Sequence, residues 1–340
     1  MIWNMESTNV KSKVFGRGAI QNIASNLGKF VVCTMDIPWK ITKNSIGATP
    51  LAVVMVDCME EDVIEGQLAT VPECDTFIGI GGGQAVDLAK YFSWKRGKRL
   101  VTIPTVLSVD AFVTPSSAVR RGNDVIYIGE ASPDPLVIDY DVIRTAPVEL
   151  NIAGVGDLLS IHTATFDWEY AHNHGKSEYE FSADDVAKAR AVLSKVMSKV
   201  DDIANVTDAG IDAIVNGYME VNSICIPAGH YRVEEGSEHY VFYAMEKKYQ
   251  RSFIHGHIVG LGVYVMSRLQ QNKSDEITKF MDQVSLHYQP KHMGLTREGV
   301  KDVLMNMKDF VASRSKLWFT IINDTDFNEK IVESVIEGLF

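Results

Sequence analysis

The sequence predicts an α/β amino-terminal domain with a mostly parallel, Rossmann-like sheet, followed by an all-helical carboxy-terminal domain. Three observations support this prediction. Short apolar runs alternate with helix-sized spacers in the first part of the chain, helical periodicity replaces them from about Asn151, and 340 residues exceed a comfortable single core. We therefore expect one domain over 1–150 and a second over 151–340, with the boundary in the Pro-containing stretch 146–154.

Five apolar runs in the first domain are expected to form buried strands. They lie at 30–34, 51–56, 76–80, 100–103 and 136–139. Continuous apolar runs separated by helix-length spacers are typical of parallel strands that are covered on both faces. In the second half, apolar residues recur at three- and four-residue steps, which predicts helices over 184–204, 211–226 and 256–269.

Composition excludes several classes of protein. The formal net charge is −11 and Lys and Arg form no stripe, which argues against nucleic-acid binding. No apolar run approaches the roughly 20 residues of a membrane helix, and the start, 1–6, lacks a signal-peptide pattern. The four cysteines have no Cys-x-x-Cys spacing, so buried free thiols are expected. These features predict a soluble, cytoplasmic protein with no nucleic-acid partner and no membrane span.

Three consecutive glycines, Gly81, Gly82 and Gly83, follow the expected strand 76–80 and precede an expected helix over 84–92. Glycines at such a turn let the backbone approach a pyrophosphate, whose charge the helix N-terminus stabilises. The turn therefore predicts a dinucleotide site, although a third glycine of the usual fingerprint spacing is missing. The alternative is a tight strand-to-helix turn without a ligand.

Polar side chains at two other strand ends are candidates for the same site. Asp36, at the end of the first expected strand, is placed to accept a ribose hydroxyl, which would favour NAD over NADP; an ordinary cap is an equal alternative. After strand 100–103 come Thr105 and Ser108, whose hydroxyls suit a phosphate or a nicotinamide carboxamide. Asp110 follows, with a carboxylate that suits substrate hydroxyls. A turn rich in side-chain caps is the alternative for this loop.

One Asp and two His residues stand in short, unusual contexts. Asp157 follows Ala-Gly-Val-Gly, His239 ends Gly-Ser-Glu-His, and His255 precedes a glycine and an expected helix. One carboxylate and two imidazoles suit Zn²⁺, Fe²⁺ or Ni²⁺ and leave coordination positions open, as a catalytic metal requires. Hydrogen-bonded core histidines are the alternative, because these spacings do not form a compact metal motif.

His162 and His257 are rival ligands. On a helix, His162 would point about 140° away from Asp157 because it lies five residues later. His257 lies two residues after His255 and would face elsewhere on the same helix. Both are therefore less favoured than His239 and His255.

Six segments, in the same order along the chain as in the family, resemble the iron-containing alcohol dehydrogenase and dehydroquinate synthase-like superfamily. Within it they look most like sn-glycerol-1-phosphate dehydrogenases, with glycerol dehydrogenases next. The segments are 15–19, 81–87, 104–110, 153–157, 236–239 and 255–256. Asp167-Trp168 and the Gly-Ser-Glu-His sequence tie the chain to the glycerol-1-phosphate branch. The resemblance implies a dehydroquinate synthase-like fold, NAD(P)-linked chemistry on a small polyol or polyol phosphate, and a homo-oligomer.

The resemblance also implies roles for individual residues. It makes Asp157, His239 and His255 the ligands of one divalent metal, with Zn²⁺ favoured over Fe²⁺ or Ni²⁺, and it makes Asp110 a substrate contact. Its cofactor contacts fall on Asp36, Gly81, Gly82, Gly83, Asp87, Thr105 and Ser108. Ile161 stands where long-chain iron alcohol dehydrogenases have a further His, which favours the three-ligand pattern. Two departures, His257 after Gly256 and the segment 231–235, put the exact substrate in doubt.

Together, these patterns predict a metal-dependent, NAD(P)-linked oxidoreductase that interconverts a small polyol of the glycerol phosphate type and its ketone, with NAD favoured. Three alternatives stay open: a glycerol dehydrogenase acting on unphosphorylated glycerol, a dehydroquinate synthase-type cyclase, and a dinucleotide-binding protein that has lost catalysis. From charge and proximity in sequence, Arg232 or Lys247 is the suggested phosphate contact.

Overall fold

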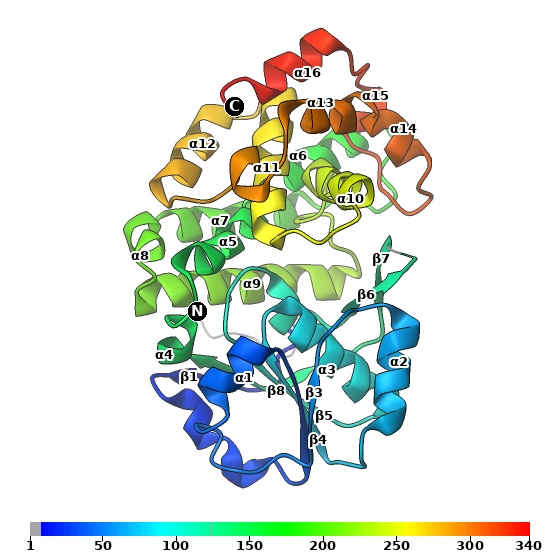
Figure 1. Ribbon diagram of the computed structural model, residues 1–340. Helices are drawn as coiled ribbons and strands as arrows, with labels where there is room; N and C mark the ends of the chain where they lie inside the picture. The colour runs from blue at the N-terminus through cyan, green and yellow to red at the C-terminus, as the bar shows by residue number, and fades with distance from the viewer. Residues whose placement is uncertain (1–7, 123) are drawn as a thin grey trace. The chain divides into compact units, whose positions relative to one another are not determined.

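The computed structural model describes residues 8–122 and 124–340, and the chain divides into two compact units, Met1–Asn151 and Ile152–Phe340. The segment 1–6, where we found no signal-peptide pattern, lies outside the described residues. The first unit contains a six-stranded parallel sheet and the second is built from helices (Figure 1). The predicted fold class is therefore confirmed.

The main sheet has the strand order β1-β8-β5-β4-β2-β3, and every neighbouring pair is parallel. Its strands are β1 (Lys13–Gly16), β2 (Phe30–Thr34), β3 (Ala52–Met55), β4 (Thr76–Gly81), β5 (Arg99–Pro104) and β8 (Pro133–Asp139). All five predicted strands form, with ends that differ by at most three residues. The sequence analysis missed β1 and a separate antiparallel hairpin, β6 (Ser117–Arg121) and β7 (Asp124–Ile128).

Helices cover both faces of this sheet. They are α1 (Asp36–Thr42), α2 (Glu61–Thr70), α3 (Gly83–Arg96) and α4 (Tyr140–Ile143), with the 3-10 helices η2 (Ala19–Asn22), η3 (Ala24–Asn26) and η4 (Asp110–Phe112). Val31, Cys33 and Phe77 join one apolar core with α2 and α3, whereas Val32 and Ile78 join a second core with η2 and with the two residues that flank η3. Successive strand residues point to opposite faces, so a strand covered on both faces has to be apolar throughout.

The path of the chain through the sheet defines where a ligand is expected. In chain order, β2, β3, β4, β5 and β8 lie side by side as 2-1-3-4-5. The chain leaves β2 toward one edge of the sheet and leaves β4 toward the other. The crevice at the carboxyl ends of β2 and β4 is therefore the topological switch point, where open α/β sheets bind their ligands.

The second unit is helical, as predicted. Its helices are α5 (Val148–Leu158), which begins before the unit boundary, α6 (Ser160–Asn173), α7 (Ala183–Met197), α8 (Val200–Ala204), α9 (Asp208–Ala228), α10 (Ser237–Tyr249), α11 (His255–Leu269), α12 (Ser274–Gln283), η5 (Pro290–Met293), α13 (Arg297–Met305), α14 (Met307–Ala312), α15 (Ile321–Asp324) and α16 (Glu329–Ile336). The helical periodicity over 184–204 corresponds to two helices, α7 and α8.

Helix α11 is the central element of this unit. All of its residues from Gly256 to Ser267 are buried, and it packs against α6, α10, α12 and α16. A helix that is apolar on every side has to be enclosed by others. His255, which opens this helix, therefore stands at the edge of a rigid core.

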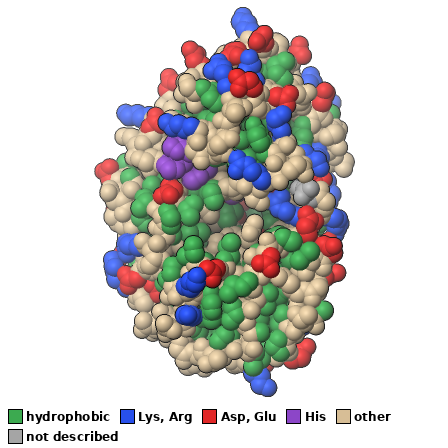
Figure 2. Space-filling model, viewed as in Figure 1, with side chains coloured by type: hydrophobic (Ala, Val, Ile, Leu, Met, Phe, Trp, Pro, Cys, Tyr) green, Lys and Arg blue, Asp and Glu red, His purple; other side chains and the backbone are tan. Residues whose placement is uncertain are grey.

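Within the described part of the chain, every helix is too short or too polar to cross a membrane. On the face shown in Figure 2, Lys and Arg side chains are interspersed with Asp and Glu rather than gathered into a stripe.

Candidate functional site

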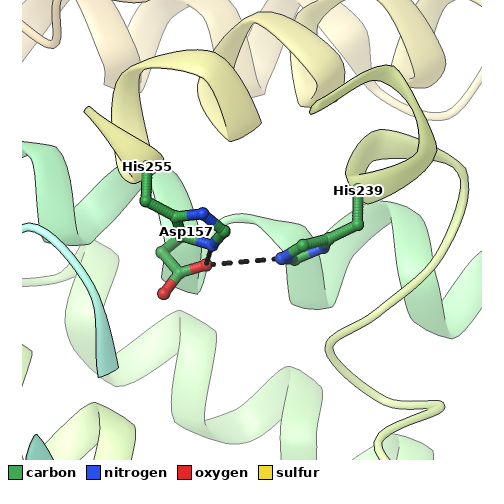
Figure 3. A group of neighbouring side chains, drawn as sticks. All are labelled: Asp157, His239 and His255. Carbon is green, nitrogen blue, oxygen red and sulfur yellow. Dashed lines mark hydrogen bonds and ion pairs between the residues drawn. The ribbon is translucent and has the colours of Figure 1, made fainter. Parts of the chain in front are cut away.

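Three helices of the second unit bring Asp157, His239 and His255 together. Asp157 is the penultimate residue of α5, His239 lies in the first turn of α10, and His255 is the first residue of α11. Their side chains point toward one another (Figure 3). The prediction that His255 opens a helix is confirmed. Of the described residues, these form the one group of three or more His, Cys, Asp or Glu side chains with the spacing of a metal site.

The distances within this group match the size of a metal ion. The Nε2 atoms of His255 and His239 lie 3.1 and 3.6 Å from Asp157 Oδ1, and one ligand atom of each residue lies within 4.8 Å of the others. Ligand atoms at about 2.1 Å from a tetrahedral Zn²⁺ are separated by about 3.4 Å. Asp157 and His239 are buried, whereas His255 retains 17% of its side-chain exposure. The donor set therefore fits a divalent cation.

The negative charges in and around this group attract a positive charge, which is either a proton or a metal ion. Burial alone disfavours the imidazolium of His239, but hydrogen bonds with Asp157 and Glu238 hold its pKa well above the usual value. Burial likewise disfavours the Asp157 carboxylate, but the charge of His255 and the hydrogen bond from His239 hold its pKa well below the usual value. Protons and a metal ion compete for these atoms, so metal affinity is expected to rise with pH.

Two glycines allow the helices that carry Asp157 and His255 to meet. A Cβ atom on Gly156 would overlap the carbonyl oxygen of Gly256, and a Cβ on Gly256 would overlap the carbonyl oxygen of Ala153. The backbones of α5 and α11 are thus in direct contact, one residue from each ligand. Only glycine allows so close an approach.

The two rival histidines lie elsewhere. His162 Nε2 lies 2.7 Å from the carbonyl oxygen of Asn272. His257 is buried, with its ring centroid 5.4 Å from that of His287. Neither belongs to the group formed by Asp157, His239 and His255.

In the first unit, the predicted dinucleotide turn stands at the switch point of the sheet. Gly81 ends β4, and Gly83 begins α3. Gly81 pairs with Pro104 of β5 and accepts a hydrogen bond from the Thr105 N–H at 3.0 Å. The turn and the loop after β5 therefore lie side by side, and the turn leads directly into the N-terminus of α3, the end of a helix that favours an anion.

Local packing also requires these glycines. Gly81 has φ +148°, and a Cβ on it would lie 2.9 Å from the Ala85 Cβ; a Cβ on Gly83 would lie 2.8 Å from Val109 Cγ1. The glycines thus permit close packing of the turn whether or not a ligand binds there. Dinucleotide binding at this turn stays a prediction.

Asp36 lies beside the turn, at the carboxyl end of the adjacent strand β2. As predicted, it follows the strand 30–34, which is the second strand of the chain because β1 precedes it; Asp36 is the first residue of α1. Its carboxylate is exposed and pairs with Lys40 Nζ at 2.6 Å. An exposed carboxylate at the switch point remains available to a ribose hydroxyl.

The loop after β5 holds the other predicted contacts. Thr105 is buried, and Ser108 and Asp110 are partly exposed. Asp110 begins η4, and its carbonyl oxygen accepts the N–H of Val113 at 2.8 Å. The loop ends at Ser117, where β6 begins.

Asp87, a predicted cofactor contact, is buried in α3 and forms an ion pair with Lys90, Oδ1 to Nζ 2.8 Å. Lys90 Nζ also donates to the carbonyl oxygens of Thr114 at 3.4 Å and Ser116 at 2.5 Å. The pair therefore anchors the loop that follows Asp110 to the helix that follows the glycine turn. This contact gives Asp87 a structural role, and its contact with a cofactor stays a prediction.

Replacing Asp87 with Asn is expected to lower the free energy of unfolding by about 3 kcal/mol, because the buried ammonium group of Lys90 loses the negative charge that it pairs with. Urea unfolding followed by tryptophan fluorescence measures this change. Asp36→Asn, in an exposed pair of the same unit, is the control and is expected to leave the midpoint unchanged. Equal effects of the two substitutions would show that burial of the Asp87 pair is unimportant.

Comparison with known proteins shows which protein family the chain resembles. Residues 34–147 match the family model described as iron-containing alcohol dehydrogenase. A glycerol-1-phosphate dehydrogenase (NAD(P)+) of Aeropyrum pernix is 32% identical over 66% of this chain and 64% of its own length. One of Sulfurisphaera tokodaii is 25% identical over 91% of this chain and 88% of its own length. The chain is thus similar to the iron-containing alcohol dehydrogenase family over residues 34–147 and to glycerol-1-phosphate dehydrogenases over most of its length. The resemblance drawn from the six segments is thus confirmed.

Solved structures of two glycerol dehydrogenases share the fold. A probable glycerol dehydrogenase of Sinorhizobium meliloti superposes with a TM-score of 0.73 at 19% identity, covering 97% of this chain and 96% of its own. The glycerol dehydrogenase of Schizosaccharomyces pombe gives 0.72 at 19% identity, covering 96% and 88%. At these identities the likeness establishes the fold alone.

The structure does not support Arg232 as a phosphate contact in this chain. The side chain is fully buried, its Nη2 donates to the carbonyl oxygens of Asp167 at 3.3 Å and Phe319 at 3.1 Å, and its guanidinium lies over the Trp318 ring. Lys247 is exposed, eight residues after His239 on α10, which is about 12 Å along the helix.

Sequence reasoning missed the buried carboxylates that surround the first turn of α10. Glu238 is fully buried beside His239, and Asp167 Oδ2 accepts the N–H of Ser237 at 2.8 Å. Burial and the nearby charge of Glu238 raise the pKa of Asp167 to about 6. In the sequence, Glu238 is marked only by its place in Gly-Ser-Glu-His. That motif indicates a likeness to glycerol-1-phosphate dehydrogenases but does not show what the Glu side chain does.

Proposed function

We propose that this protein is an NAD(P)-dependent oxidoreductase that interconverts glycerol 1-phosphate and dihydroxyacetone phosphate at a metal centre formed by Asp157, His239 and His255. The convergence of these three side chains is the observation that carries the proposal. The similarity to glycerol-1-phosphate dehydrogenases supports the choice of substrate.

The three ligands leave open coordination positions for substrate oxygens. A divalent metal bound there supplies Lewis acidity, which favours loss of the proton from a hydroxyl and polarises a carbonyl in the reverse direction. Asp157 provides the negative charge of the ligand set, and the burial of Asp157 and His239 keeps water from competing with the substrate. Asp110 orients the substrate through its carboxylate.

The nicotinamide coenzyme binds at the switch point of the sheet. Gly81, Gly82 and Gly83 let its pyrophosphate approach the N-terminus of α3, and the Asp36 carboxylate accepts the adenosine ribose hydroxyls. Thr105 and Ser108, in the loop beside the glycine turn, hold the phosphate or the carboxamide. Because Asp36 is negative and exposed, it repels a 2′-phosphate, so NAD is the favoured coenzyme.

The test compares dihydroxyacetone phosphate with dihydroxyacetone, each with NADH and with NADPH, on protein loaded with Zn²⁺. We expect kcat/KM for the phosphorylated ketone to exceed that for dihydroxyacetone by at least about 100-fold, as the similarity to glycerol-1-phosphate dehydrogenases implies. NADH is expected to be the better coenzyme.

The other outcomes identify the alternatives. Faster reduction of dihydroxyacetone would indicate a glycerol dehydrogenase. Phosphate release without net oxidation of NADH would indicate a cyclase of the dehydroquinate synthase type. NADH binding without turnover of any polyol or ketone would indicate a protein that has lost catalysis.

A further inference from the structure

Glu238 is a buried carboxylate in the first turn of α10, and it contacts the ring of the neighbouring candidate ligand His239. Its Oε1 accepts the Gly236 N–H at 2.6 Å and lies 2.9 Å from His239 Nδ1. Its Oε2 accepts the Thr163 hydroxyl at 2.7 Å. The side chain is fully buried, so no water competes for these oxygens. Glu238 is therefore held in one orientation from three directions.

This orientation determines which nitrogen of His239 carries a proton. An ionised carboxylate only accepts hydrogen bonds, so Nδ1 has to be the donor toward Glu238. The lone pair of neutral imidazole is then on Nε2, the atom that faces Asp157 Oδ1 at 3.6 Å. The contact with Glu238 thus selects the tautomer that offers Nε2 as a ligand, and a carboxylate partner also makes that nitrogen more basic.

The negative charge of Glu238 also favours the binding of a cation at this site. His239 and His255 both lie in the first turn of a helix, where the helix dipole is positive and disfavours a cation. Asp157, near the end of α5, supplies one negative charge against the two positive charges of a divalent metal. Glu238 supplies a second, one hydrogen bond away from a ligand.

Two neighbouring carboxylates serve other groups. Asp167 accepts the N–H groups of Ser237 and Ile321 at 2.8 and 3.1 Å. Glu246, on the same helix as Glu238, accepts the N–H of Phe253 at 3.1 Å. Among these three buried carboxylates, Glu238 is the one with a hydrogen bond to a ligand imidazole.

We propose that Glu238 is a positioning residue of the metal centre, which fixes the tautomer of His239 and places a negative charge next to this ligand of the ion. This inference rests on the proposed metal site. Carboxylates that orient a ligand histidine in this way typically contribute 10- to 100-fold to metal affinity.

The test measures the Zn²⁺ affinity of the full-length protein by competition with a chromophoric chelator. Glu238→Gln keeps an oxygen that can accept from Gly236 and His239 but removes the charge, and we expect it to weaken Zn²⁺ binding by about 10- to 100-fold. The unfolding midpoint of the metal-free protein is measured in parallel to detect a purely structural effect. Glu246→Gln is the matched control, a buried carboxylate on the same helix, and is expected to change Zn²⁺ affinity by less than about threefold.

A second measurement uses no substitution. Long-range ¹⁵N–¹H spectra of the Zn²⁺-loaded wild-type protein, labelled at histidine, report which ring nitrogen of His239 carries a proton, and we expect Nδ1. A proton on Nε2, or equal losses of affinity in Glu238→Gln and Glu246→Gln, would overturn the role of Glu238. Unchanged Zn²⁺ affinity in Glu238→Gln would overturn it too and leave the metal site standing, whereas a wild-type protein that binds no metal would overturn both.

Discussion

Asp157→Asn and His255→Ala are each expected to lower kcat/KM for dihydroxyacetone phosphate by at least about 10³-fold, while the Kd for NADH stays within about threefold. Loss of a ligand removes the metal and with it several kcal/mol of stabilisation of the transition state. The predicted coenzyme contacts lie in the other unit of the chain, so the substitutions leave them in place. Steady-state kinetics and quenching of protein fluorescence by NADH measure the two quantities.

His162→Gln is the control for these substitutions. His162 is a histidine near Asp157 in sequence, but its ring bonds to the Asn272 carbonyl rather than joining the ligand group. We expect kcat/KM within about threefold of wild type. Undiminished turnover by a verified metal-free Asp157→Asn protein would refute the role of the metal.

Gly156→Ala and Gly256→Ala are the second pair of substitutions with a large expected effect. Each added methyl group would overlap a backbone carbonyl oxygen of the facing helix, which cannot rotate away as a side chain can. The helices that carry Asp157 and His255 would have to separate. We expect each substitution to lower the free energy of unfolding by about 3 kcal/mol. We also expect the amount of bound Zn²⁺ to fall well below one ion per chain.

Urea unfolding and elemental analysis measure these two effects on the same preparations. Gly66→Ala, in α2, is the control because a Cβ there meets no atom within 4 Å, and alanine favours the helix. Gly66→Ala is expected to leave the free energy of unfolding unchanged or to raise it. Full Zn²⁺ content with wild-type stability in Gly156→Ala would show that the close helix contact does not position the ligands.

The elements that could be predicted were those whose pattern reflects burial on all sides. The runs 30–34 and 76–80 are continuous and apolar because the sheet is covered on both faces, and both strands form where expected. Strand β1 was missed because it is only four residues long and includes an exposed Lys13. The hairpin β6–β7 was missed because its strands are only five residues long and because charged residues, Arg120, Arg121 and Asp124, flank its turn.

The candidate site was predicted less completely than the fold. The local sequence around Asp157 and His255 identifies two candidate ligands, but they lie 98 residues apart, and no spacing rule brings them together. Their meeting depends on the contact between Gly156 and Gly256, which is a tertiary feature. Glu238 could not be assigned a role because its function depends on facing into the protein rather than toward solvent.

The most direct test of this account is the metal content of the purified protein, measured by elemental analysis after exposure to Zn²⁺ and removal of excess metal. The account predicts one Zn²⁺ per chain for the wild type and much less than one for a variant that combines Asp157→Asn with His255→Ala. Equal metal content in both proteins would contradict it, because the metal would then be bound elsewhere.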